Sequence, residues 1–560
     1  MNLQPIFDIP ELCHQHGVVH AVISPGSRNA ALTIAFARHP RIQCYSIPDE
    51  RSAAFIALGL SLHTHHPTVL ICTSGSAGLN YAPAVAEAYF NQVPLLVLTA
   101  DRPPELIGKR DGQTIYQRAL FGPHAKAYFD FPSFEETPGN ACIQSALHTT
   151  TSQAPGPVHV NIPFREPFYP EANKVYRATP GLQVTPIAPP DCPTPPVDTA
   201  ALDSIQNYQK TILIVGQGTC DPRTVALLNT LSEQLRIPII ADVISNAHRV
   251  THAIQHQDLF LSQNDPALRP DLVLSMGLSV VSKNLKLYLK SIEGLIHWHI
   301  TPNDDAADTY DCLSQTIPTT PEDFCQTWIS KHSSPSIERE AFYNKWQAAN
   351  QKAAQVIQNL STRTWTETSL YHELLSQLPV PLDLHLANSM AVRYANVIGV
   401  QDPNIQVYCN RGTSGIDGSN STAVGTCLAS GRNTLLLTGD VAFLYDRNAF
   451  WHNHLPDNFK IVVFNNNGGG IFRMIEGPSA QPELKPFFET DQQSNASHVA
   501  GEFGFRYYGV DDYTAWDDQL TDFLDYSQGR AILEIHSDAQ QNKIAYKQLF
   551  KNMKELALSH

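Results

Sequence analysis

Polar residues that can supply oxygen ligands follow two apolar segments in the last quarter of the sequence. The first segment, 435–437, precedes Asp440, and the second, 461–464, precedes Asn467 and Gly469. If the two segments are neighbouring parallel strands, their carboxyl ends meet at one edge of a sheet, where α/β proteins bind ligands. Asp440 offers a carboxylate oxygen and Asn467 an amide oxygen. Gly469 offers a backbone carbonyl that can approach closely because glycine has no side chain. This set of oxygens suits a divalent cation.

The charge of this set predicts what else binds there. Mg2+ takes near-octahedral oxygen coordination and is usually held by one or two carboxylates together with phosphate oxygens. A single protein carboxylate leaves the remaining charge of the cation to the ligand, so we predict a diphosphate cofactor held by Mg2+ or Mn2+. The alternative is two ordinary strand ends, since Gly-Asp and Asn-Gly are common turn dipeptides.

Short apolar segments alternate with helix-like segments along almost the whole chain. Buried strands separated by helices are typical of parallel sheets covered on both faces. We therefore predict an α/β fold of three doubly wound parallel-sheet domains in series. Strands are expected at 18–23, 68–72, 94–98, 157–162, 212–215, 239–243, 272–276, 297–300, 406–409, 435–437, 461–464 and 531–535.

The segments that join the predicted domains differ from them in composition. Seven prolines between positions 180 and 196 predict a semi-rigid linker, because proline removes a donor and restricts the backbone. Polar, helix-prone residues after position 335 predict a helical connector. The predicted organisation is an N-terminal domain at 1–175, the linker at 176–200, a central Rossmann-like domain at 201–335, the connector at 336–364 and a C-terminal domain at 365–560.

Composition and charge argue against two classes of partner. The chain has 560 residues, 42% of them hydrophobic, and a formal net charge of -15. Nucleic acids are not expected as partners, because their phosphates bind basic surfaces. No run of about 18 apolar residues is present, so no membrane span is expected. The ten cysteines are scattered without a CxxC spacing, and the first residues lack a signal-peptide pattern. We therefore expect a reducing, cytoplasmic location.

Two stretches near the N-terminus carry further candidate residues. Ser27 and Arg28 follow a predicted strand and precede a predicted helix, where free backbone N–H groups and the helix dipole favour an anion. A plain helix start, with serine as the cap, is equally consistent with them. Asp49 and Glu50 begin another predicted helix, where Asp49 can cap the helix and Glu50 can complement its dipole.

Longer motifs relate the chain to a known family. The Gly-Asp and Asn-Asn pairs resemble the signature of thiamine diphosphate enzymes, with Val441 at a position where glycine is usual. The chain also resembles the 2-succinyl-5-enolpyruvyl-6-hydroxy-3-cyclohexene-1-carboxylate synthases of menaquinone biosynthesis. The motifs that carry this resemblance are SPGSRNAALT, DERSAAFIALGLS, TSGSAGLNYAPAVAEAYFNQVPLLVLTADRPPEL, NSMAVRYAN, NRGTSGIDG and NNNGGGIF.

The resemblance implies a thiamine diphosphate-dependent transferase. Its reaction would be decarboxylation of 2-oxoglutarate, followed by 1,4-addition of the succinyl-semialdehyde carbanion to isochorismate. Glu50 would be the catalytic residue, because the family's glutamate hydrogen-bonds the aminopyrimidine ring that takes the proton from thiazolium C2. The N-terminal domain would then bind the pyrimidine and the C-terminal domain the diphosphate and metal. The family also implies a homodimer or homotetramer with its active site between subunits.

The resemblance also implies positions for the cofactor and both dicarboxylate substrates. Ile416 would press the cofactor into a bent form, and apolar side chains would keep water from the reacting centre. Asn284 stands where some members have a basic residue, and Asp111 and Gly112 depart from the family's usual sequence before its glutamine. Implied cofactor contacts are Glu50, Ser414, Gly415, Ile416, Asp440, Val441, Asn467, Gly469, Ile471 and Phe472, with Asp440, Asn467 and Gly469 on the metal. Implied substrate contacts are Ser27, Arg28, Arg102, Gln113, Lys283, Ser389, Arg393, Arg411 and Ile475.

Two other functions fit parts of the sequence. Another thiamine diphosphate-dependent 2-oxoacid decarboxylase, or an acetohydroxyacid-synthase-like carboligase, would share the cofactor residues but not the arginine-bearing motifs. A non-catalytic protein on the same fold would not need Glu50, Asp440 and Asn467 together. Turnover of 2-oxoglutarate with and without isochorismate distinguishes these functions.

Overall fold

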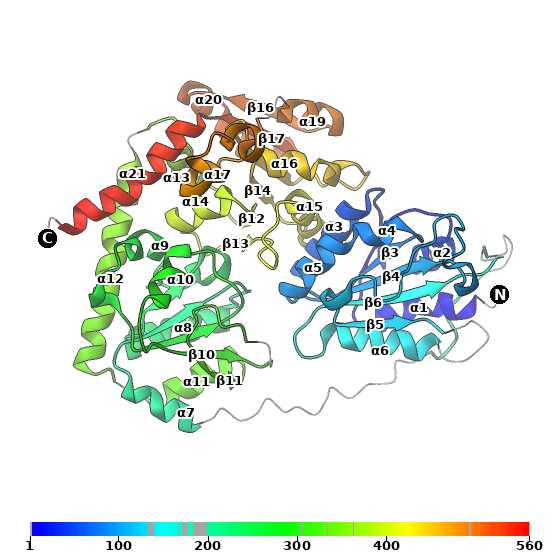
Figure 1. Cartoon of the computed structure of the whole chain (residues 1–560), viewed down its shortest axis with the longest axis horizontal. Coiled ribbons are helices and arrows are strands. Elements are labelled where there is room, and N and C mark those ends of the chain that lie inside the picture. The colour runs from blue at the N-terminus through cyan, green and yellow to red at the C-terminus, as the bar shows by residue number, and fades with distance from the viewer. Residues whose placement is uncertain are drawn as a thin grey trace.

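Three sheets, each built from parallel strands, organise the chain (Figure 1). We call each sheet with its helices the first, second or third unit; in Figure 1 they lie at the right, lower left and top. The predicted class of three parallel-sheet α/β units is confirmed. Within the ranges described, no helix is both long and apolar enough to cross a membrane. This computed structural model describes residues 3–132, 139–166, 169–170, 177–182, 199–303, 306–332, 334–361, 363–491 and 494–558.

The first sheet is buried on both faces. Leu95 and Val97 belong to one apolar cluster, whereas Leu96 and Leu98 belong to another, because successive side chains of a strand point to opposite faces. The strand order is β2-β1-β3-β4-β6-β5. Its strands are β1 (His20–Ile23), β2 (Gln43–Ser46), β3 (Thr68–Cys72), β4 (Leu95–Asp101), β5 (Ala127–Asp130) and β6 (Pro157–Pro163), and its helices are α1 (Gln4–Gln15), α2 (Ala30–Ala37), α3 (Glu50–Thr64), α4 (Ser76–Asn80), α5 (Ala82–Phe90) and α6 (Gly139–Thr151).

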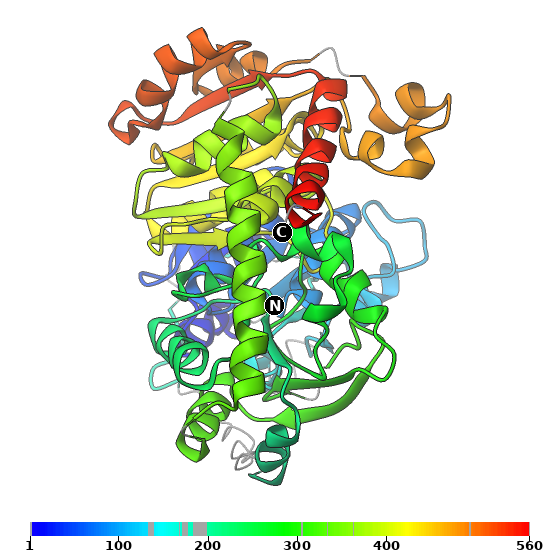
Figure 2. The same cartoon turned by 90° about the vertical axis from the view of Figure 1, so that its left-hand side faces the viewer.

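The second sheet has five strands in the order β11-β10-β9-β7-β8. The long helix α12 (Ile337–Gln358), light green in Figure 2, runs beside this unit towards the third. Most of the predicted linker at 176–200 lies outside the described residues. The strands are β7 (Thr211–Val215), β8 (Ile239–Ala241), β9 (Leu272–Met276), β10 (Ile296–Thr301) and β11 (Leu313–Pro318), and the helices are α7 (Thr199–Ser204), α8 (Pro222–Leu235), α9 (Gln257–Phe260), α10 (Lys283–Lys290) and α11 (Pro321–Lys331).

The third sheet has the order β13-β12-β14-β15-β17-β16 and brings the two predicted ligand-bearing strands together. Gly439 of β14 pairs with Phe464 of β15, so both strands end at the same edge. The strands are β12 (Leu382–Leu386), β13 (Ile405–Tyr408), β14 (Thr434–Gly439), β15 (Phe459–Asn465), β16 (Arg506–Val510) and β17 (Ala531–His536). The helices are α13 (Glu367–Ser376), α14 (Met390–Ile398), α15 (Ser419–Ser430), α16 (Asp440–Tyr445), α17 (Ile471–Met474), α18 (Glu476–Ser479), α19 (Ala496–Phe503), α20 (Tyr513–Leu524) and α21 (Ala539–Leu558).

The first and third units are joined by a close crossing of α3 and α15. A Cβ atom at Gly59 would lie 2.1 Å from the Thr422 carbonyl oxygen, and one at Gly425 would lie 2.1 Å from that of Ile56. Only glycine fits at these two points. Residues of both units share one apolar cluster around this crossing, which fixes the two sheets relative to each other.

Candidate active site

A cavity of about 390 Å³ opens at the carboxyl edge of the third sheet. Its walls come from the ends of β12, β14 and β15, from the start of α14 and from the loop before α15. Parallel strands bring these loops together because their carboxyl ends share one edge. The predicted residues that line it are Ser389, Arg393, Arg411, Ser414, Ile416, Asp440, Val441, Gly469, Ile471, Phe472 and Ile475.

Asp440 is one of two buried carboxylates that line this cavity, with 3% of its surface exposed. Its Oδ1 accepts a hydrogen bond from the backbone N–H of Val441 at 2.8 Å, and its Oδ2 accepts one from Gly468 at 2.7 Å. Burial raises the pKa of Asp440 to about 7 despite these two donors. A bound cation would favour the ionised form, since an opposite charge offsets the cost of desolvation.

The loop after β15 carries the other predicted metal ligands. The Gly469 N–H donates to the Glu489 carbonyl oxygen at 2.7 Å, and a Cβ atom at Gly468 would lie 2.5 Å from that same oxygen. The segment ending at Glu489 therefore fixes this loop. Asn467 has a positive φ of 66° and is exposed. Gly469 lines the cavity, whereas Asn467 does not.

Glu367 and Asn466 are two of the lining residues that were not predicted from the sequence. Glu367, at the start of α13, is buried and accepts a hydrogen bond from the Asn466 side-chain amide at 2.8 Å. Asn466 Oδ1 is buried and has no hydrogen-bond donor in the described part of the chain. An unpaired oxygen beside Asp440 is what a cation or a donor of the cofactor would satisfy. Asn466 belongs to the predicted asparagine run, but nothing in the sequence marked Glu367.

Two arginines give the cavity its positive charge. Arg393 lies on α14 and donates to the Ser389 carbonyl oxygen, and Ser389 itself has a positive φ of 76°. Arg411 donates to the Asn388 side-chain oxygen at 3.0 Å. Burial, and then the neighbouring charge of Arg411, lower the pKa of Arg393. Because like charges raise the free energy of the empty site, the cavity favours an anionic ligand.

The loop that carries Arg411 is fixed by Glu87 of α5, from the first unit. The Glu87 carboxylate is 1% exposed and accepts hydrogen bonds from the N–H groups of Gly412 at 2.8 Å and Thr413 at 2.6 Å. The Thr413 hydroxyl donates to the same carboxylate at 2.8 Å. Thus a carboxylate 325 positions away in the sequence sets the shape of one wall of the cavity.

The predicted residues of the first unit gather at the carboxyl edge of their own sheet, and none of them lines the cavity. Glu50 is the first residue of α3, whose N-cap Asp49 accepts a hydrogen bond from Ser52 N–H at 3.0 Å. Ser27 and Gln113 are exposed. The structure therefore places the predicted site residues in two groups on two sheets, and we call these groups the two half-sites.

The two arginines of the first unit have partners within it. The buried Arg28 guanidinium donates to the Phe164 carbonyl oxygen at 3.1 Å and lies 3.4 Å from a carboxylate oxygen of Glu166. Arg102 lies 3.9 Å from a carboxylate oxygen of Asp111. Any substrate would compete with these contacts, so the implied substrate role of both arginines stays a prediction.

Comparison with known proteins decides the family. Residues 8–120 match the thiamine pyrophosphate enzyme N-terminal TPP-binding domain, and residues 196–386 match the middle domain of thiamine pyrophosphate enzymes. Over 572 residues, covering 100% of both chains, the protein is 41% identical to a 2-succinyl-5-enolpyruvyl-6-hydroxy-3-cyclohexene-1-carboxylate synthase of Cytophaga hutchinsonii. The chain belongs to this synthase family. Proteins of the same name from Flavobacterium johnsoniae and Desulfotalea psychrophila are 36% and 35% identical over 97% and 96% of this chain, and over 98% of their own lengths.

Because the chain belongs to the synthase family, its cofactor is thiamine diphosphate. The residues of the cavity can therefore be compared with what each end of this cofactor requires. The residues fit the diphosphate end, because the buried Asp440 carboxylate and the unpaired Asn466 oxygen lie beside the glycine-rich loop. The pyrimidine end has its predicted partner, Glu50, in the other half-site. Gly415 and Asn467 lie in the loops of the cavity without lining it.

One residue that the synthase family resemblance predicted to contact substrate, Lys283, lies outside both half-sites. Lys283 is the first residue of α10 in the second unit and is exposed. The next residue, Asn284, donates from its side-chain amide to the Asp258 carbonyl oxygen at 2.8 Å and so does not replace a basic residue.

A second cavity, of about 380 Å³, lies where all three units meet, and it contains none of the predicted site residues. It includes Gln217 and Gly218 after β7, and the residues that line it include no aspartate, glutamate, lysine or arginine. An uncharged cavity suits a metal diphosphate or a dicarboxylate less well than the cavity of the third sheet, which is lined by both carboxylates and arginines.

Proposed function

We propose that this chain is a thiamine diphosphate-dependent carboligase of menaquinone biosynthesis. It would decarboxylate 2-oxoglutarate and add the resulting succinyl-semialdehyde carbanion in a 1,4 manner to isochorismate, giving the product for which the family is named. One observation carries this proposal: a buried carboxylate suited to a metal diphosphate, Asp440, and two arginines suited to a dicarboxylate, Arg393 and Arg411, line one cavity. We place the enzyme in the cytoplasm, where its nine described cysteines, all free thiols, would stay reduced.

In this proposal the third unit holds the metal and the diphosphate. Asp440, Asn467 and the Gly469 carbonyl would bind Mg2+ or Mn2+, and Ser414, Gly415 and Val441 would contact the cofactor. Glu50 would hold the aminopyrimidine ring by a hydrogen bond and so govern the proton at that ring. When bound, thiamine diphosphate supplies the electron sink for decarboxylation.

The remaining residues would position the substrates and exclude water. Ile471, Phe472 and Ile475 form the apolar side of the cavity, and Ile416 packs against the core beside it. Water excluded there cannot protonate a carbanion. Ser389, Arg393 and Arg411 would bind one carboxylate substrate, while Ser27, Arg28, Arg102, Gln113 and Lys283 are the further family positions proposed to contact substrate.

We also propose that the active site lies between two subunits. Every residue that lines the cavity belongs to the third unit, whereas Glu50 belongs to the first. Ile475, which lines the cavity, is 44% exposed, and Phe487, in the segment that ends at Glu489, is 75% exposed. Exposed apolar side chains at a site that lacks half of its residues favour cover by another copy of the chain, in a homodimer or homotetramer.

Identification of the product by mass tests the proposed reaction. The protein is incubated with thiamine diphosphate, Mg2+, 2-oxoglutarate and isochorismate, with a matched reaction lacking isochorismate. We expect the named cyclohexene carboxylate and CO2 only in the complete reaction. Equal release of CO2 with no joined product would instead favour a simple 2-oxoacid decarboxylase.

A further inference from the structure

Glu367 is the other buried carboxylate that lines the cavity of the third sheet, and it is the centre of a hydrogen-bonded network. Its Oε1 accepts hydrogen bonds from the Asn466 side-chain amide at 2.8 Å, the Asn542 side-chain amide at 2.9 Å and the Ser537 hydroxyl at 3.1 Å. These donors come from the loop after β15, from α21 and from the residue that follows β17. One oxygen atom of Glu367 therefore connects the cavity loop to two other segments of the third unit.

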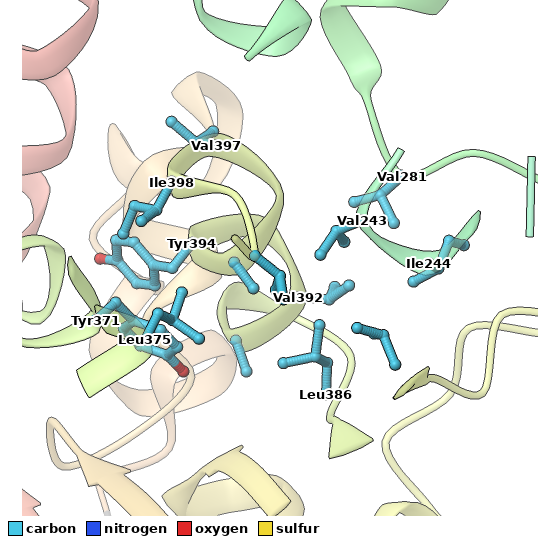
Figure 3. Packing of buried hydrophobic residues seen from close by; sticks show 14 of the residues in the cluster. Val243, Ile244, Val281, Tyr371, Leu375, Leu386, Val392, Tyr394, Val397 and Ile398 are labelled. Atoms are coloured by element: carbon cyan, nitrogen blue, oxygen red, sulfur yellow. The ribbon is translucent and has the colours of Figure 1, made fainter. Parts of the chain in front are cut away.

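Aromatic stacking fixes the helix that carries Glu367. Figure 3 shows Tyr371 of α13 beside Tyr394 of α14. The Tyr371 ring stacks on that of Tyr394 with centroids 4.9 Å apart, and on that of Phe464 with centroids 4.0 Å apart. Phe464 lies in β15, two residues before Asn466. Packing therefore holds the start of α13 next to the end of β15 independently of the bond between Asn466 and Glu367.

The network determines which end of the Asn466 amide faces Glu367. The backbone N–H of Glu367 can only donate, and it does so to the Asn542 side-chain oxygen at 2.9 Å. The NH2 group of Asn542 must then be the donor to Glu367 Oε1, which makes Oε1 an acceptor. The Asn466 amide consequently turns its NH2 group to Oε1, and its oxygen points the other way.

Asn466 is the asparagine of its run whose buried side-chain oxygen is left for a ligand. Asn465 uses both ends of its side chain, since its amide donates to Glu534 at 2.7 Å and its oxygen accepts from the Asn467 N–H at 3.0 Å. The Asn466 oxygen has no donor within the described ranges, and Asn466 lines the same cavity as Asp440. Mg2+ binds oxygen, so this orientation suits a metal diphosphate, whereas a reversed amide would turn its hydrogens to the cation.

Glycine at position 470 leaves room for the same amide. Gly470 has a φ of -53° and a ψ of -26°, which any residue can adopt, so the backbone does not require glycine there. A Cβ atom at this position would lie 2.8 Å from Asn466 Nδ2. A side chain at position 470 would thus push the amide away from Glu367.

We propose that Glu367 is a positioning residue for the metal diphosphate, because it holds the Asn466 amide with its oxygen towards the bound cation. This inference rests on the proposed function and adds a residue that no sequence motif indicated. It assigns Glu367 an effect on metal affinity that acts through Asn466.

Calorimetric titration of Mg2+, with thiamine diphosphate present and both substrates absent, tests this role. We expect Glu367→Met, which removes the acceptor, to raise the Kd for Mg2+ roughly 10- to 100-fold, as for other partners that orient metal ligands. Glu367→Gln should recover most of the affinity, because a glutamine oxygen can accept the same three hydrogen bonds. Ser537→Ala is the matched control: it removes another donor of Oε1 and keeps that of Asn466, so its Kd should match that of the wild-type protein.

Turnover at increasing Mg2+ concentration provides a second readout. If Glu367 acts through the metal, Glu367→Met should approach the wild-type kcat once Mg2+ is saturating. A general loss of folded protein would lower kcat at every Mg2+ concentration.

Gly470→Ala tests the same amide without a change at Glu367, and it carries the test if Glu367→Met does not fold. Its methyl group would displace the Asn466 amide, so we expect the affinity for Mg2+ to fall. Gly477→Ala, with nothing within 4 Å of its Cβ position, should leave the affinity unchanged.

Three outcomes would overturn the proposal. These are a wild-type Mg2+ affinity of Glu367→Met or Gly470→Ala, equal losses in Glu367→Met and Glu367→Gln, and a comparable loss in Ser537→Ala. A wild-type protein that binds Mg2+ with the cofactor but forms no joined product would contradict the proposed function alone, since the titrations need no substrate.

Discussion

At the scale of single residues, the site combines buried charges with donors that the backbone supplies. The Asp440 carboxylate accepts two backbone hydrogen bonds, which stabilise its ionised form. Burial raises the free energy of the ionised form by more than these bonds lower it, so the pKa is raised. Since the pKa of Asp440 in the folded chain, about 7, exceeds that of an unfolded aspartate, this group stabilises the metal-free protein at low pH. That stabilisation is lost as the pH rises through about 7.

Metal binding should reverse this dependence. Mg2+ needs the ionised carboxylate, so protons compete with it below pH 7. We expect the affinity for Mg2+, measured by calorimetric titration with the cofactor present, to fall about tenfold per pH unit below 7 and to level off above it.

Asp440→Asn is the control for this measurement and should bind Mg2+ weakly without that pH dependence. Burial also raises the pKa of Asp446 to about 7, so the metal affinity, rather than the stability of the protein, reports on Asp440. An affinity that stays constant between pH 6 and pH 8 would contradict the assignment of Asp440 as a ligand.

At the scale of helices and strands, loops of the site are held by contacts between units. Glu87 of α5 fixes the loop of Arg411, and the crossing of α3 with α15 sets the distance between the first and third sheets. Helix α3 begins at Glu50, and α15 follows the cavity loop that contains Ile416. The crossing therefore fixes the position of Glu50 relative to the cavity loop that contains Ile416.

Replacement of Gly425 by alanine tests this crossing. The added Cβ would lie 2.1 Å from the Ile56 carbonyl oxygen, so the helices must separate. We expect the free energy of unfolding, measured in urea, to fall by about 1–3 kcal/mol, as for overpacked cores.

Gly501→Ala provides a matched comparison, because this helical glycine of α19 has nothing within 4 Å of its Cβ position. That variant should be unchanged or more stable by up to about 1 kcal/mol, from helix propensity. If Gly425→Ala proved as stable as Gly501→Ala, the two helices would not be in the close contact described.

At the scale of the whole molecule, the two half-sites lie on different sheets, and the cavity is lined by the third unit alone. If the active site lies between subunits, as proposed, two variants that are each inactive can restore one intact site in a mixed dimer. A site within one chain cannot be restored in this way. Complementation between two inactive variants distinguishes these two arrangements.

We expect Glu50→Gln and Asp440→Asn each to lose nearly all activity, by at least about 100-fold for the former, which removes a proton-transfer partner. When the two variants are mixed under conditions that exchange subunits, activity should return to about a quarter of the wild-type level. Half of the dimers are then mixed, and each mixed dimer has one site with both native residues.

Subunit exchange is verified by mass measurement of differently tagged copies. If exchange occurs and activity stays absent, both residues of each site come from one chain, and the proposed dimeric site is wrong. The same reactions of the single variants alone give the background.

The sequence predicted most of the architecture because buried parallel strands are short, continuous apolar runs. Every predicted strand segment overlaps a strand of the structure, and 68–72 coincides with β3. The strands that were not predicted are β2, β5, β11, β16 and β12. The first four are sheet edges with exposed residues, and β12 carries a buried Asp383 and His385 that interrupt its apolar pattern.

Local sequence alone determined the ends of β14 and β15, their candidate oxygen ligands and the arginine-bearing motifs, since each depends on residues close together in the chain. Only the tertiary structure decided that Glu87 fixes the loop of Arg411 and that Glu367 holds Asn466. These relations join segments far apart in the sequence. Their energies depend on burial and on neighbouring charge, which a linear pattern does not contain.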